Sequence, residues 1–157
     1  MDSKIFMSDY SEKFEKMRVA GKLAARTLDM LTDNIKPGVT TEFIDKLGYE
    51  FIKDNGAYSA PLFYRGFKKS LCTSLNHVVC HGIPSDRVLI EGDALNVDVT
   101  AIIDDHYGDT SRMFCIGKTP VKVNNLIEAT YESMMRAIKL LKPGLRLGDI
   151  GHEIQSF

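Results

Sequence analysis

The sequence has no large excess of charge of either sign and no long apolar run. Its 157 residues carry 20 basic and 21 acidic side chains, for a net charge of −1 with neutral histidines. This balance excludes the basic footprint with which proteins bind nucleic acids or anionic membranes. No apolar stretch approaches the roughly 20 residues that cross a bilayer. We therefore expect a soluble protein whose partner is small or peptidic.

Cysteine is also scarce, and the three cysteines, Cys72, Cys80 and Cys115, cannot all pair within one chain. Nothing at the N-terminus combines the basic segment, apolar run and cleavage site of a secretory leader. Both features favour a reducing, cytoplasmic location. We interpret Cys80 and Cys115 as small buried hydrophobic side chains, whereas Cys72 is either such a residue or part of a site.

What the sequence does have is an ordinary globular composition, 44% hydrophobic and 26% charged, which is enough for one domain with a substantial core. Steps of three and four predict a first helix that buries Phe14, Met17, Ala20, Leu23, Ala24, Leu28 and Leu31. A second helix is predicted to begin at Thr40 or Thr41 and to bury Phe43, Ile44, Leu47 and Phe51. Overall the pattern predicts an α+β chain with helices at about 8–53, a β-rich hairpin region at about 57–117 and helices at about 122–157.

The tripeptide Lys-Pro-Gly occurs twice, at residues 36–38 and 142–144. At the same offset of 106 residues, Leu28 matches Met134 and Ile44 matches Ile150. Either the tripeptide recurs by chance after two helices, or the chain contains a degenerate internal repeat. If the repeat is real, its second copy ends where its strands should begin.

Residues 96–102 and 107–115 are predicted to form a hairpin around a turn at Asp104-Asp105. With this turn, Asp98 faces Ser111 and Thr100 faces Asp109. Because strand side chains alternate between faces, five polar side chains project from one face, namely Asn96, Asp98, Thr100, Asp109 and Ser111. The other face is largely apolar and suited to packing against helices; on it lie Val97, Val99, Ala101, Thr110, Phe114 and Ile116.

The two aspartates become diagonal neighbours, with backbones about 7–8 Å apart. Carboxylates that lean toward each other from this distance could bind one cation or bridge two cations about 3.5–4 Å apart. The alternative is an ordinary solvated strand face. Aspartate is disfavoured inside strands, however, and a conflict between a residue and its local structure is typical of functional sites.

Three segments now coincide: "NHVVCHGIP" at 76–84, "GDALNVDVT" at 92–100 and "HYGDTSRMF" at 106–114. Together, and in this order, they resemble the N-terminal portion of the type I methionine aminopeptidases. The resemblance implies a pita-bread (creatinase/aminopeptidase) fold with a pseudo-twofold repeat, truncated within the second repeat. It also implies that residues 1–157 are the N-terminal part of a single catalytic domain.

In that family the aspartate of "NVDVT" chelates one divalent metal ion and the aspartate of "GDTS" bridges two, which corresponds here to Asp98 and Asp109. The histidine of "CHGIP", here His81, lies beside the scissile amide and hydrogen-bonds the substrate. The resemblance implies three further ligands, one histidine and two glutamates, from the second half of the fold. The ions could be Mn, Co, Fe or Zn, because hard oxygen ligands accept each of them.

The resemblance also implies a pocket for the methionine side chain, lined by Tyr64, Phe67 and Cys72. The backbone carbonyls of Asn76 and Val78 match a monovalent-cation site. Tyr64 and Phe67 could instead be core aromatic residues. The remaining histidines, His77, His106 and His152, are interpreted as surface or structural residues. Three positions depart from residues common in the family: Pro61, Arg65 and Phe67.

The implied activity is metal-dependent removal of the N-terminal methionine from nascent polypeptides whose second residue is small. For the full-length protein the resemblance implies a cytoplasmic monomer that associates with ribosomes. The alternatives are another aminopeptidase or a prolidase of the same fold, or a peptide-binding module without catalysis. Because two carboxylates are only part of a metal centre, we also expect that the chain alone could be inactive.

Overall fold

The computed structural model describes residues 3–157, with side chains from Tyr10 onward. The chain divides into two compact units, residues 1–118 and 119–157, which are described separately. The first unit contains α1 (Ser3–Thr32), α2 (Thr41–Asp54), β1 (Tyr58–Ser59), the 3-10 turn η1 (Tyr64–Gly66), β2 (Cys72–Leu75), β3 (Ala94–Ile103) and β4 (His106–Cys115). The second contains α3 (Val121–Leu140) and α4 (Leu147–Ser156). No helix within residues 3–157 has the length and apolar character needed to cross a membrane.

Strand β3 is the centre of the sheet in the first unit. It pairs with β4 along one edge, and along the other edge with β1 near Ala101 and with β2 at residues 95–98. All of these pairings are antiparallel. Strands β1 and β2 therefore share one edge, and residues 60–71 leave the sheet between them. The predicted α+β class is confirmed, although the pattern at residues 70–80 yields only the four-residue strand β2.

The predicted hairpin register is confirmed. Asp98 pairs with Ser111, and Thr100 pairs with Asp109. The turn residues Asp104 and Asp105 have φ values of 49° and 60°. Positive φ at both central positions is the geometry of a type I′ turn, whose twist matches that of paired strands. The two-residue loop therefore determines which side chains share a face.

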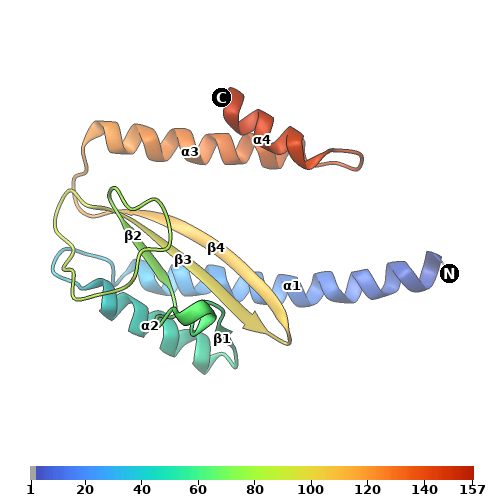
Figure 1. The fold of residues 1–157 in the computed structure, drawn as a ribbon, viewed down its shortest axis with the longest axis horizontal. Coiled ribbons are helices and arrows are strands. Elements are labelled where there is room, and N and C mark those ends of the chain that lie inside the picture. Colours follow the sequence, from blue (N-terminus) through green and yellow to red (C-terminus); the bar gives the residue numbers. More distant parts are fainter. Residues whose placement is uncertain (1–2) are drawn as a thin grey trace. The chain divides into compact units, whose positions relative to one another are not determined.

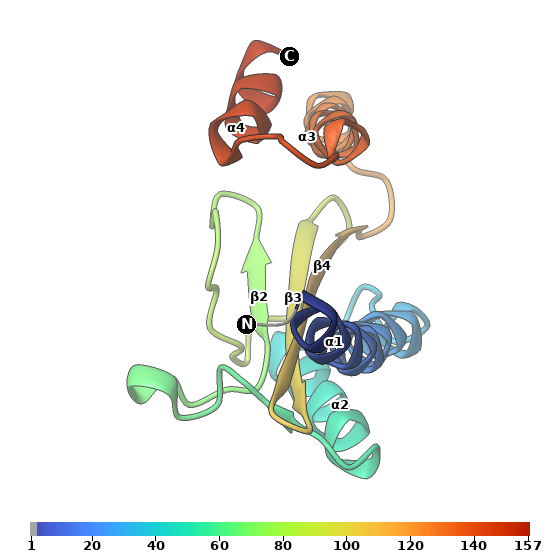
Figure 2. The same cartoon turned by 90° about the vertical axis from the view of Figure 1, so that its right-hand side faces the viewer.

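Helices α1 and α2 lie on one side of the sheet, and η1 lies on the other (Figure 2). The buried cluster between helices and sheet contains Leu28 and Leu31 from α1, Ile44 from α2, and Val97 and Val99 from β3. The prediction that Phe14 and Met17 belong to this core is wrong, because both are about half exposed. At about 1.5 Å per residue, α1 is longer than the strands that it covers, and its N-terminal turns extend past the hairpin (Figure 1).

One glycine lets α1 approach the sheet closely. A Cβ atom at Gly108 on β4 would lie 2.1 Å from the backbone of Ala20 in α1. No side chain larger than hydrogen fits at this contact. The glycine of the "HYGDTS" segment is therefore a packing requirement, placed next to Asp109.

The Thr40 side chain caps α2 by accepting a hydrogen bond from the Phe43 N–H, as predicted. The prediction that Phe43 is buried is wrong, since this first-turn side chain is 44% exposed. The preceding turn has Pro37, then Gly38 at φ 90°, and the Val39 N–H donates to the Lys36 carbonyl. Proline followed by a positive-φ glycine is typical of a type II turn.

The second unit repeats this local arrangement. Its turn has Gly144 at φ 92°, and the Leu145 N–H donates to the Lys142 carbonyl. Helix α4 begins at Leu147, which is 106 residues after the first residue of α2. An Asp149 carboxylate oxygen accepts from the Arg146 N–H at the start of α4, and Arg136 of α3 stacks over the Phe157 ring at 3.9 Å. The matching turns support the internal repeat over the chance interpretation.

Candidate metal centre

The two predicted carboxylates lie together on the face of the sheet opposite α1 and α2. Asp98 is half-buried on β3 and Asp109 is exposed on β4. Burial raises the pKa of the Asp98 carboxyl above its ordinary value, and the charge of Asp109 and a hydrogen bond to it raise this pKa further. The two carboxyl groups therefore interact electrostatically across the hairpin. Two like charges this close repel unless a proton or a cation lies between them.

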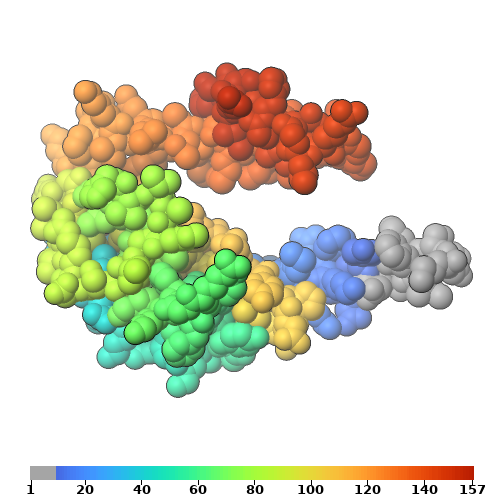
Figure 3. Space-filling model, viewed as in Figure 1, coloured from blue at the N-terminus to red at the C-terminus, as the bar shows by residue number. Residues whose placement is uncertain are grey.

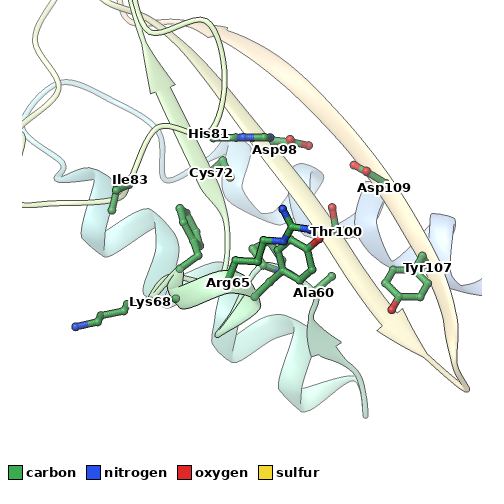
Figure 4. A pocket seen from close by; sticks show the side chains of 14 residues that line it. Ala60, Arg65, Lys68, Cys72, His81, Ile83, Asp98, Thr100, Tyr107 and Asp109 are labelled. Atoms are coloured by element: carbon green, nitrogen blue, oxygen red, sulfur yellow. The ribbon is translucent and has the colours of Figure 1, made fainter.

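His81 is held beside this pair by a close backbone contact. Its side chain lies next to Asp98 in the same cavity (Figure 4), and its electrostatic interaction acts to lower the pKa of the Asp98 carboxyl. His81 has φ 56°, a left-handed conformation that is uncommon for residues other than glycine. The next residue, Gly82, accepts from the Thr73 N–H at 2.8 Å and donates to Ser74 Oγ at 3.1 Å.

The glycine is required for this contact, because a Cβ at Gly82 would lie 2.2 Å from the Thr73 carbonyl oxygen. Strained backbone held by surrounding contacts is typical of functional sites. Strand β2 therefore clamps the loop so that the His81 side chain projects toward the carboxylates.

A cavity of about 810 Å³ contains both carboxylates and His81. Its opposite wall is the segment that leaves the sheet between β1 and β2, anchored where the Ala60 N–H donates to the Thr100 carbonyl at 2.9 Å. This segment brings Tyr64 and Phe67 to the cavity. In the space-filling view the green segment at residues 60–71 lies on the visible face (Figure 3). Tyr64 is 64% exposed, so its interpretation as a core aromatic residue is wrong.

Asp45 of α2 anchors the end of this wall. Its Oδ1 accepts from the Ser70 N–H at 2.8 Å, the Leu71 N–H at 2.9 Å and the Ser70 hydroxyl at 2.7 Å. The carboxylate is almost fully buried. Sequence reasoning missed this residue, although an aspartate beside the buried Ile44 in an amphipathic helix could have indicated it.

Cys72 lies in the floor of the cavity, where it pairs with Asp98 across β2 and β3. Burial and the nearby charge of Asp98 raise the pKa of its thiol to about 11. The thiol is therefore protonated at neutral pH and is a poor nucleophile. Its side chain is part of the lining of the cavity that contains the carboxylates.

Asn76 and Val78 lie outside this cavity and line a second one of about 280 Å³. The Asn76 side chain donates to Asp93 at 2.9 Å and accepts from the Ala94 N–H at 3.0 Å. Asp93, which is buried, accepts from the Ile90 N–H as well. The Asn76 side chain is thus occupied in holding the loop that leads to His81.

Two cysteine interpretations need correction. Cys80 and Cys115 are exposed, whereas the sequence had suggested buried side chains. Cys115 belongs to the outward face of β4, as Asp109 does, because strand residues alternate. His77 and His152 are exposed, as predicted, and His106 contacts the Asp104 carbonyl beside the hairpin turn.

The donors on this face fit a divalent cation in part. Paired carboxylate oxygens are hard ligands that suit such ions and relieve their own repulsion on binding. Among the residues whose side chains the structure describes, however, no group of three or more His, Cys, Asp or Glu side chains could hold a metal. The face therefore supplies two carboxylates and an adjacent histidine.

Comparison with known proteins identifies the family of which this arrangement is typical. The model of metallopeptidase family M24 matches residues 15–157. The chain belongs to metallopeptidase family M24. Membership in this family implies a divalent metal centre, in agreement with the paired carboxylates.

Individual relatives agree with this membership. The chain is 55% identical over 149 residues to a methionine aminopeptidase of Rickettsia prowazekii, covering 94% of this chain and 58% of the relative. The crystal structure of methionine aminopeptidase from Rickettsia prowazekii matches with a TM-score of 0.91 over 93% of this chain and 59% of that one. An X-Pro aminopeptidase from Thermotoga maritima, 21% identical, has a TM-score of 0.80 over 93% of this chain and 40% of its own, and shares the fold alone. The fold is the pita-bread fold, and the chain spans under 60% of the length of the relatives at 55% identity.

Proposed function

We propose that this chain supplies half of the active site of a methionine aminopeptidase, which removes the N-terminal methionine from nascent polypeptides whose second residue is small. The observation that carries the proposal is the cavity that joins Asp98, Asp109 and His81 to the aromatic wall formed by Tyr64 and Phe67. The name and 55% identity of the Rickettsia relative support it.

In this proposal Asp98 and Asp109 would hold the two divalent ions. Such ions, when bound, polarise the substrate carbonyl and lower the pKa of water. The identity of the ions, Mn, Co, Fe or Zn, belongs to the same proposal. Because two carboxylates cannot complete two coordination shells, the remaining donors come from another polypeptide segment.

The other side chains of the cavity bind and orient the peptide. His81, whose position is fixed by the Gly82 contact, hydrogen-bonds the scissile amide. Tyr64, Phe67 and the protonated Cys72 surround the methionine side chain. The backbone carbonyls of Asn76 and Val78 bind a monovalent cation in this proposal. The full-length protein is proposed to be a cytoplasmic monomer that meets its substrates at the ribosome.

The test begins with the chain as it is, incubated with Mn²⁺ or Co²⁺ and the peptides Met-Ala-Ser and Leu-Ala-Ser. Metal stoichiometry is measured beside peptide release. The proposal expects weak metal binding that disappears in Asp98→Asn/Asp109→Asn. Two tightly bound ions with full turnover by the chain alone would contradict the half-site.

A fusion to the uncovered C-terminal part of the Rickettsia relative supplies the missing donors. The fusion is expected to release methionine from Met-Ala-Ser and to leave Leu-Ala-Ser intact. His81→Ala should lower kcat by about 100-fold, the lower range for one acid–base or orienting group. Equal cleavage of both peptides, or of Xaa-Pro peptides in preference, would favour another aminopeptidase or a prolidase.

A further inference from the structure

Arg65 places a positive charge in the cavity that contains Asp98 and Asp109. Its side chain points from the η1 segment toward Thr100, whereas the Lys68 side chain points away from the cavity (Figure 4). The neighbouring wall is aromatic or apolar. The cavity therefore has carboxylates on the sheet and a guanidinium on the opposite wall.

The backbone around Arg65 holds this direction. Arg65 has φ 48° and ψ 33°, and its neighbours Phe63 and Gly66 have φ values of 68° and 86°. Side chains other than glycine rarely adopt this left-handed region. Hydrogen bonds from the Phe63 N–H to the Phe67 carbonyl, 2.7 Å, and from the Phe67 N–H to the Tyr64 carbonyl, 2.9 Å, close the segment. Strain that surrounding bonds maintain is characteristic of ligand-binding segments.

The guanidinium has no anionic partner among the side chains from Tyr10 onward, and Lys69 of the same segment differs in this respect. The Lys69 ammonium is paired with the Glu42 carboxylate of α2. Arg65 instead lies over the Tyr64 ring, 5.4 Å from its centroid. A guanidinium has five donors in a planar fork that matches a carboxylate, and stacking on a ring leaves these donors available.

We propose that Arg65 is a specificity residue that binds the carboxylate of an acidic side chain in the peptide substrate. The proposal rests on the proposed function. With the N-terminal residue directed toward Asp98 and Asp109, the rest of the peptide leaves past the η1 wall. Since the second residue is small, the carboxylate belongs to an Asp or Glu at the third or fourth position. A fork-to-carboxylate pair gives this selection.

The experiment titrates the Mn²⁺-loaded chain with the amidated peptides Met-Ala-Glu-Ser and Met-Ala-Gln-Ser, followed by NMR of the peptide. Amidation removes the competing terminal carboxylate. The Glu peptide is expected to bind about two- to fivefold more tightly, the range for a partly exposed ion pair. The difference should shrink in 1 M salt. Arg65→Gln should abolish it, and Arg65→Glu should favour a Lys peptide instead.

Lys68→Gln is the matched control, because Lys68 lies on the same wall and points away; the Glu-to-Gln ratio should be unchanged. Arg65→Gly suits the left-handed backbone and should also lose the preference while keeping the thermal midpoint. Equal affinities in the unmodified chain, a preference that survives Arg65→Gln, or no binding of either peptide at millimolar concentration would each overturn the proposal.

Changing the N-terminal residue of the peptide tests the proposed function separately from the Arg65 assignment. A Leu-Ala-Glu-Ser peptide is titrated alongside. Equal binding of Met and Leu peptides with a retained Glu preference would sink the proposed function and leave the Arg65 assignment intact. Methionine selectivity without a Glu preference would sink the Arg65 assignment alone.

Discussion

Neighbouring residues of the β3–β4 hairpin have opposite environments. Val97 and Val99 are fully buried against α1 and α2, whereas Asp98 between them is half-buried beside Asp109 on the other face. The helix side lowers the free energy of the fold by removing apolar surface from water. The site side raises it, since two carboxylates repel. One hairpin therefore separates stability and chemistry by the alternation of its side chains.

The largest expected effect concerns the contact that holds α1 on the helix side. Gly108→Ala would place a Cβ 2.1 Å from the Ala20 backbone, so we expect a loss of more than about 3 kcal/mol of unfolding free energy. Gly21→Ala is the control from the opposite side of this contact. Its Cβ meets no atom within 4 Å, so the helix should gain roughly 0.5–1 kcal/mol. Urea denaturation measures both, and a stable Gly108→Ala chain would refute the close packing.

The next prediction compares the two faces directly. Val99→Ala removes buried methyl groups and should lower stability by about 1.5–3 kcal/mol without changing Mn²⁺ affinity. Asp98→Asn should instead lower Mn²⁺ affinity without lowering stability. In EDTA it should raise stability by roughly a few tenths of a kcal/mol, because cross-strand repulsion disappears.

Mn²⁺ affinity in the same Asp98→Asn chain should fall by at least about tenfold, the lower bound for changes around metal ligands. Isothermal titration and thermal denaturation give the two quantities. If Val99→Ala weakened metal binding as much as Asp98→Asn, the two faces would not be independent.

Asp45 connects the helix side to the wall of the cavity. Asp45→Ala leaves the buried Ser70 and Leu71 N–H groups without their acceptor, which should cost about 1–3 kcal/mol. The same substitution should accelerate hydrogen exchange of the Ser70 and Leu71 amides. Asp54→Ala, at an exposed position of the same helix, should change neither quantity. Unchanged protection of Ser70 in Asp45→Ala would show that the wall has another anchor.

The smallest expected effect is at the rim of the helix side. Arg112 on β4 pairs with Asp29 of α1 at 2.8 Å, and both side chains are largely exposed. Arg112→Gln should lower stability by less than about 1 kcal/mol. A double-mutant cycle with Asp29→Asn isolates the pair, whose coupling should fall as salt rises. A coupling energy that did not change with salt would indicate that the two side chains stabilise the fold by packing and not by their charges.

The hairpin was predictable because its information is local. Alternating polarity and the Asp104-Asp105 turn predict both the register and the face that carries Asp98 and Asp109, and the structure confirms them. The Thr40 cap and the two Lys-Pro-Gly turns are equally local. In each case neighbours in sequence determine the geometry.

Phe14 and Phe43 show where such reasoning stops. Both lie at helix positions suited to a core, yet both are exposed, since periodicity gives the direction of a side chain and not the extent of the surface that it meets. Sequence reasoning also missed the hydrogen bonds of Asp45 and the contact of Gly82 with Thr73. Asp45 binds residues that are distant in sequence, and a loop folds Gly82 back onto Thr73.

The sequence by itself determined the family resemblance, the elements and the two faces of the hairpin, because hydrophobic period and turn chemistry act over a few residues. The tertiary structure alone decided that the segment between β1 and β2 stands opposite the carboxylates and that Arg65 points into the same cavity. That arrangement depends on packing contacts such as Asp45 with Ser70, which bring together parts of the chain that no local pattern relates.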